Sequence, residues 1–309
     1  MNPDNELTIC SVYHSRESKR LLELNYNLVR TLNPDADIRW VVANNTPDGF
    51  SEKLDPKKFI IVKGADEISG LLPWMWGSYR HSRALKNTLP HIATRYALIL
   101  DIDFYILVPS WMNIIPQHMQ EAKLAFFGVP WNPSYQRKWR YFPSPHTLFI
   151  DLNRVPRDQL DFEPVFPDML HPTLGLRIKE RAKFFLPDSL RRRLELGTYS
   201  DTGYPIYKRF SGITRHECPQ PVFRKTPTII DQMLPDRLSF IPKRPGYFTP
   251  IGFREQGFPD CVSEGWEEFM WRDRPYGFHI RGTHKLHNDV DGNIAHVHTV
   301  LDECVKKIL

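Results

Sequence analysis

The order of apolar and polar residues predicts that strands and helices alternate through the first half of the chain. Residues 96–100 are apolar at every position, which is typical of a strand covered on both faces. Because helical spacing separates the strand-like runs, we expect right-handed crossovers and a mainly parallel sheet with helices on both faces. The strands are expected at residues 7–13, 38–43, 59–62 and 96–100, and the helices at residues 17–32, after an N-cap at Ser15, and at 79–95.

The second half of the chain is less regular. Residues 146–152 (HTLFIDL) predict one more strand, and residues 155–172 are rich in proline and aspartate, as in a loop. Residues 174–196 form a basic segment with helical character. We therefore predict an α/β half over residues 1–155 and a less regular half over residues 156–309, as parts of one continuous domain.

Composition indicates an ordinary folded protein. Of 309 residues, 41% are hydrophobic and 25% are charged, so global disorder is excluded. The net charge of +5 fits anionic ligands such as nucleotides, or ordinary surface charge, and is too small for a dedicated nucleic-acid binder, so no nucleic-acid partner is expected. Isolated cysteines and the lack of a secretory signal or a long apolar run favour the cytoplasm.

Two carboxylates follow the apolar strand directly. Asp101 and Asp103 lie where a parallel strand would open into the ligand crevice of an α/β sheet. Oxygen ligands in this place suit Mg²⁺ or Mn²⁺, which would take further ligands from a substrate diphosphate. The alternative is that both aspartates are solvated turn residues or helix caps.

Three segments give the chain a resemblance to glycosyltransferases of the GT-A fold, and most of all to family 2. The segment TICSVYHS resembles the family's first strand and the polar turn after it. The segment VVANNTPDG resembles the strand that ends in a second polar turn, and YALILDIDFYI resembles the DxD segment. The resemblance covers about residues 7–155. It implies a nucleotide-diphospho-sugar transferase, with a sheet of the Rossmann-like kind and an acceptor-binding part towards the C-terminus.

The resemblance also implies roles for single residues at the nucleotide. His14 would line the base and ribose, Asn44 and Asn45 would contact the base or ribose, Asp101 would lie near the ribose and the metal, and Asp103 would bind the metal. Family 2 usually has an acidic residue in the second turn. The asparagines here leave the base open among UDP-, GDP- and dTDP-type donors.

One face of the second helix carries polar residues that suit a sugar diphosphate. Arg80, Arg83 and Asn87 are three and four positions apart, so they share a face, and an arginine fork can meet phosphate oxygens. Solvated surface charge is the alternative.

The same resemblance implies a metal-binding histidine near the C-terminus. His279 is favoured and His284 comes second, because the family has a late histidine before a glycine-containing loop. Neutral imidazole is a suitable ligand for Mn²⁺. Packing or surface histidines are the alternative for each of them.

An inverting transfer also needs a general base near the acceptor hydroxyl. Asp201 resembles the family's catalytic acidic residue in its order along the chain, and the alternative is an N-cap for a short helix over residues 204–210. Trp131, Tyr135 and Trp139 could form a platform for the acceptor sugar or pack in the core.

The sequence therefore predicts a metal-dependent glycosyltransferase that moves a sugar to a hydroxyl of a glycan or lipid-linked acceptor, as in polysaccharide biosynthesis. The basic segment 174–196 could make peripheral contact with the inner face of a membrane. The alternative is that it is a solvated helix face. Two other functions stay open. A sugar-phosphate nucleotidyltransferase would need a glycine-rich loop after the first strand, where this chain has His14-Ser15-Arg16. A non-catalytic carbohydrate- or membrane-binding module could keep the fold without the chemistry.

Overall fold

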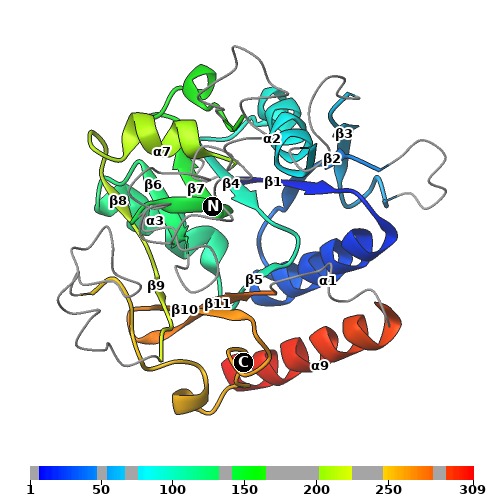
Figure 1. The fold of residues 1–309 in the computed structure, drawn as a ribbon, viewed down its shortest axis with the longest axis vertical. Helices are drawn as coiled ribbons and strands as arrows, with labels where there is room; N and C mark the ends of the chain where they lie inside the picture. The colour runs from blue at the N-terminus through cyan, green and yellow to red at the C-terminus, as the bar shows by residue number, and fades with distance from the viewer. Residues whose placement is uncertain are drawn as a thin grey trace, which may run out of the picture.

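A sheet of seven strands forms the centre of the molecule (Figure 1), and its order is β3-β2-β1-β4-β7-β6-β8. The computed structural model describes residues 7–46, 54–66, 76–131, 141–164, 202–224, 246–280 and 290–309. The strands of the sheet are β1 (Leu7–Tyr13), β2 (Arg39–Asn44), β3 (Ile60–Lys63), β4 (Tyr96–Leu100), β6 (Phe126–Pro130), β7 (Pro143–Asp151) and β8 (His216–Glu217).

The first four strands of the sheet run parallel, and β7 runs against its two neighbours β4 and β6. The prediction of an α/β fold on a mainly parallel sheet is confirmed. β4 lies between β1 and β7 and is buried at every residue, because both of its faces are covered. The parallel arrangement brings the carboxyl ends of β1, β2, β3 and β4 to the same edge of the sheet.

Helices cover both faces of this sheet. Alternate strand residues point to opposite faces, so Ile9 and Leu98 join one core cluster while Cys10 and Ile99 join another. In Figure 1, α1 and α2 lie on opposite sides of β1. The helices are α1 (Arg16–Leu32) and α3 (Trp111–Glu121) on the first face, and α2 (Trp76–Thr88) and α7 (Tyr204–Phe210) on the second.

A second, antiparallel sheet packs on the α1 side and was not predicted. Its order is β5-β11-β10-β9, with α9 packed against it at the bottom of Figure 1. Phe269 and Tyr276 face the central core, while Met270 and Phe278 face α9 and α1. The elements are β5 (Phe104–Ile106), β9 (Gln220–Pro221), β10 (Glu267–Trp271), β11 (Arg274–His279) and α9 (Val290–Ile308).

The element boundaries agree with the sequence in most places. Ser15 is the N-cap of α1, because its side chain accepts the Ser18 N–H at 3.1 Å. The second helix begins and ends earlier than expected. Its α-helical part stops at Thr88, and a short 3-10 turn takes over at Leu89–His91, because Pro90 has no N–H to continue the helix.

Two further points concern segments in the second half. The short helix α7 begins after Gly203, which takes the N-cap position, so the alternative role of Asp201 as that cap is wrong. The basic segment 174–196 lies outside the described residues. Among the described helices, none has the length and apolar character that a membrane span requires.

Candidate metal and nucleotide site

The two aspartates lie in a tight turn between β4 and β5. The Asp101 N–H donates to the carbonyl oxygen of His146 at 3.0 Å, and the Phe104 N–H donates to the carbonyl oxygen of Asp101 at 3.1 Å. Both side chains are mostly buried, with 18% of Asp101 and 16% of Asp103 exposed. A carboxylate in such a place needs a compensating partner, because burial penalises its charge.

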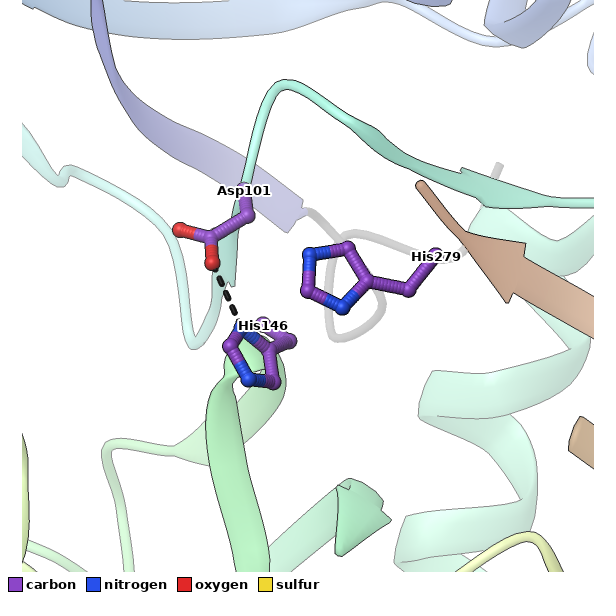
Figure 2. A group of neighbouring side chains, drawn as sticks. All are labelled: Asp101, His146 and His279. Atoms are coloured by element: carbon purple, nitrogen blue, oxygen red, sulfur yellow. Dashed lines mark hydrogen bonds and ion pairs between the residues drawn. The ribbon is translucent and has the colours of Figure 1, made fainter. Parts of the chain in front are cut away.

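His146 is the partner of Asp101. Strand β7 pairs with β4 so that Leu100 faces Thr147, which brings the preceding His146 beside Asp101. Its Nδ1 lies 2.6 Å from Asp101 Oδ2 (Figure 2). His81 of α2 approaches the other carboxylate oxygen at 3.6 Å. Burial raises the pKa of Asp101, but the hydrogen bond and the charge of His146, with the charges of His81 and His279, outweigh it and lower the pKa to about 2.

His279 lies between two carboxylates. Its Nε2 is 3.3 Å from Asp103 Oδ1, and its Nδ1 is 2.8 Å from Oε2 of the buried Glu267. The antiparallel pairing of β11 with β5 places His279 opposite Phe104, the residue after Asp103. Burial lowers the pKa of His279, but the charges and hydrogen bonds of Asp103 and Glu267 outweigh burial. The pKa of His279 is therefore raised to about 9.

Side chains from three separate segments thus meet in a group that could hold a metal ion. One ligand atom each from Asp101, His146 and His279 lies within 4.8 Å of the others, and the rings of the two histidines are 4.3 Å apart between centroids (Figure 2). Carboxylate oxygen and imidazole nitrogen are the donors that Mn²⁺ and its neighbours take in proteins. The residues present therefore fit a divalent cation.

Sequence reasoning named Asp101, Asp103 and His279 as candidate site residues but did not name His146, His81 or Glu267, which the structure places in contact with them. The only signal for His146 was its position at the start of a strand-like run. That run becomes informative once β7 is known to lie antiparallel beside β4, because the first residues of β7 then meet the last residues of β4.

The predicted nucleotide-contacting residues lie at the same edge of the sheet. His14 follows β1 and has an exposed side chain. Desolvation by its surroundings lowers the pKa of His14, and the nearby His81 lowers it further, while the charge of Asp103 raises it.

The two asparagines at the end of β2, Asn44 and Asn45, form hydrogen bonds within the chain. Oδ1 of Asn44 accepts the N–H of Thr46 at 2.9 Å. Asn45 is buried, its Nδ2 donates to the Arg80 carbonyl at 3.1 Å, and its Oδ1 accepts the Ala65 N–H at 2.7 Å. Asn45 thus joins the second polar turn to α2, and its contact with a base or ribose stays a prediction.

The polar face of α2 is also held by neighbouring segments. The Arg83 guanidinium lies 4.6 Å from the centroid of the Tyr79 ring, and its Nε is 3.7 Å from Glu163. Asn87 donates to the carbonyl of Gly64 at 2.9 Å. Arg80 donates to the Asn45 carbonyl at 3.4 Å. The side chain of α2 that reaches Asp101 is His81 instead.

Trp131 is the one predicted acceptor residue that the structure describes. It is buried, and its ring meets the His146 ring edge to face at 4.8 Å. In this position Trp131 packs beside the group of side chains that could hold a metal ion. The remaining predicted site residues, Tyr135, Trp139, Asp201 and His284, lie outside the described residues.

A cavity of about 360 Å³ opens at the opposite edge of the sheet, where β1, β2 and β3 begin. Its lining includes Leu7, Trp40, Phe59 and Thr94, and none of the predicted site residues. We assign the site to the carboxyl edge nevertheless, because titratable and metal-ligating groups converge there.

No known protein family matches the sequence, and no curated protein matches it. Solved structures of GT-A glycosyltransferases match the fold over about half of the chain. The mannosyltransferase PcManGT of Pyrobaculum calidifontis, solved with GDP-Man and Mn²⁺, is 14% identical, with a TM-score of 0.33, over 52% of this chain and 51% of that one.

Two more solved structures have a similar sequence identity, coverage and TM-score. Residues 1–349 of TarS from S. aureus are 12% identical, with a TM-score of 0.34, over 51% of this chain and 50% of that one. The galactosyltransferase LgtC, solved with donor and acceptor sugar analogues, is 15% identical, with a TM-score of 0.30, over 50% of this chain and 62% of that one. The chain thus spans about half to two thirds of the length of these proteins. Because the TM-scores are below 0.5, the functional assignment rests on the site geometry alone.

Proposed function

We propose that this protein is a metal-dependent glycosyltransferase that uses a nucleoside-diphosphate sugar of the UDP, GDP or dTDP type. The observation that carries the proposal is the meeting of Asp101, Asp103 and His279 at the carboxyl edge of a mainly parallel sheet. Open α/β sheets bind their ligands at this edge. His14 and the turn after β2 lie at the same edge and would border the nucleotide.

We propose a separate role for each group of site residues. Asp101, Asp103 and His279 would hold Mn²⁺ or Mg²⁺, and the bound ion would offset the charge that develops on the departing diphosphate. Asp201 is proposed as the base that takes the proton from the acceptor hydroxyl, in an inverting displacement at the anomeric carbon. Trp131, Tyr135 and Trp139 are proposed for the side of the acceptor, a glycan or lipid-linked glycan, with 174–196 as a membrane contact.

The first test is binding of the donor nucleotide. Thermal unfolding is measured with UDP, GDP and dTDP, each with and without Mn²⁺, because a ligand that binds only the folded state raises the melting temperature. We expect one nucleotide to stabilise the protein, and to do so much more strongly with Mn²⁺. If no nucleotide raises the melting temperature under either condition, the proposal is wrong.

The second test is the Asp103→Asn variant, assayed for transfer or for hydrolysis of the stabilising donor. Loss of the metal's contribution, several kcal/mol, lowers the rate about a hundredfold or more, at about 1.4 kcal/mol per tenfold. Asp302→Asn on α9 is the matched control, since Asp302 contacts His298 on the exposed face of that helix. Release of pyrophosphate from a nucleoside triphosphate and a sugar phosphate would identify a nucleotidyltransferase instead.

A further inference from the structure

His146 is built into the site as firmly as the predicted ligands. Its side chain is 12% exposed, and it contacts Asp101 on one side and the edge of Trp131 on another. Its backbone is fixed by the ladder between β4 and β7, where its carbonyl accepts the Asp101 N–H. A histidine held in this way presents its imidazole in one orientation, because neither its backbone nor its ring can turn freely.

The spacing of the ligand atoms suits a shared ion. An octahedral ion with bonds of about 2.1 Å places neighbouring ligand atoms ~3 Å apart. Asp101 Oδ2 and His146 Nδ1 are 2.6 Å apart, and Asp103 Oδ1 and His279 Nε2 are 3.3 Å apart. Within each pair the two atoms therefore lie near the separation that neighbouring ligands of one ion would have, and ligand atoms of Asp101, His146 and His279 lie within 4.8 Å of one another.

Each of the two imidazoles contacts a different neighbouring side chain. Glu267, buried in β10, accepts a hydrogen bond from His279 Nδ1 and so leaves Nε2 directed to Asp103. Metal-binding histidines characteristically have such a partner on their other nitrogen. Trp131 packs against the His146 ring in an edge-to-face contact.

We propose that His146 is a metal ligand together with Asp101 and His279, and that this pair of imidazoles makes the site select transition-metal ions over Mg²⁺. This inference rests on the proposed function and names the cation class for the same site. Mg²⁺ prefers oxygen ligands and keeps several waters, whereas imidazole suits ions from Mn²⁺ to Zn²⁺ in the first transition row. Without His146 the site would hold one imidazole and two carboxylates, and would accept Mg²⁺ more readily.

The test measures metal binding directly, on the metal-free full-length protein. Co²⁺ and Mg²⁺ are each titrated by calorimetry into the wild type and His146→Asn. We expect Co²⁺ to bind at least about a hundredfold more tightly than Mg²⁺ to the wild type. His146→Asn is expected to lower Co²⁺ affinity by about 10- to 100-fold and Mg²⁺ affinity by less than about threefold. Equal losses for both ions, or no loss for either, would overturn the inference.

Two control variants separate a ligand from a neighbour. His81→Asn removes another imidazole that contacts Asp101, at 3.6 Å, and is expected to leave the ratio of Co²⁺ to Mg²⁺ affinity unchanged. His298→Asn removes a half-exposed histidine on α9 and reports binding of Co²⁺ at the surface. If His81→Asn lowers the ratio as much as His146→Asn does, the metal ligand has been assigned to the wrong histidine.

A measurement on the wild type avoids dependence on the folding of any variant. Pulsed electron paramagnetic resonance of bound Mn²⁺ detects the ¹⁴N nuclei of directly coordinated imidazoles. Two coordinated imidazoles are expected, and one or none contradicts the proposal. Co²⁺ binding that depends on His146, with no nucleotide bound under any condition, would retain the metal site and reject the glycosyltransferase. Nucleotide binding that Mg²⁺ supports as well as Mn²⁺ does would retain the glycosyltransferase and reject the selection of transition-metal ions.

Discussion

Replacement of Glu267 by glutamine tests whether the carboxylate behind His279 tunes the metal site. Glu267 is buried, and its Oε2 accepts from His279 Nδ1 at 2.8 Å. Glutamine keeps the shape and an acceptor oxygen but removes the charge. A hydrogen bond to a charged group contributes about 1.5–3 kcal/mol and a neutral one about 0.5–1.5 kcal/mol, so the loss is about 1–1.5 kcal/mol. At about 1.4 kcal/mol per tenfold, Mn²⁺ affinity should fall about tenfold.

The assay is calorimetric titration of Mn²⁺ into each metal-free variant, with chemical denaturation alongside. Glu217→Gln is the matched control, because Glu217 accepts from a ring nitrogen of His118 at the same 2.8 Å, on α3 and away from the three ligands. Its Mn²⁺ affinity should equal that of the wild type. The reasoning is refuted if Glu267→Gln binds Mn²⁺ as tightly as the wild type, or if Glu217→Gln weakens binding equally.

Three further predictions concern the structure around the site. Asp151→Ala removes a fully buried carboxylate that accepts two hydrogen bonds from Arg95, at 3.0 and 3.2 Å. The free energy of unfolding, measured in urea, should therefore fall by about 3 kcal/mol, and a fall below about 1 kcal/mol would contradict this prediction. The Gly252 N–H and the neighbouring arginines hold the pKa of Glu255 at about 2, below its ordinary 4.5, so its stabilisation is complete above pH 4.5 and is lost as the pH falls towards 2. Denaturation at several pH values should show a shallower loss in Glu255→Gln, and identical slopes would refute this. Gly277→Ala would place a Cβ 2.4 Å from the Tyr105 carbonyl oxygen, where β11 meets β5, so it should cost about 1–3 kcal/mol of stability and weaken Mn²⁺ binding; unchanged thermal unfolding would count against it.

Local features of the sequence were enough for the four parallel strands β1, β2, β3 and β4. The apolar run 96–100 predicted a strand covered on both faces, and Ser15 predicted the start of α1, because burial on two faces and helix capping both depend on residues next to one another. The predicted helix 79–95 extends past the end of α2, because Pro90 lacks the N–H that would continue the α-helix.

The candidate site shows a similar division. Asp101 and Asp103 stand out in sequence because two carboxylates directly follow an apolar strand. By residues alone, His279 was one of three histidines in a short segment, and its role came from family resemblance. The antiparallel pairing with β5 brings it beside Asp103.

The sequence by itself determined the alternating strands and helices and the acidic turn after β4. Only the tertiary structure brings His146 of β7 and Glu267 of β10 to the same candidate site. His146 meets Asp101, 45 positions earlier, because β7 pairs antiparallel with β4. Glu267 meets His279 because β10 pairs antiparallel with β11 in the second sheet. Sequence patterns report which face of an element is buried. They do not report which strand lies beside it. Here the neighbouring strands supply the imidazole of His146 and the carboxylate behind His279.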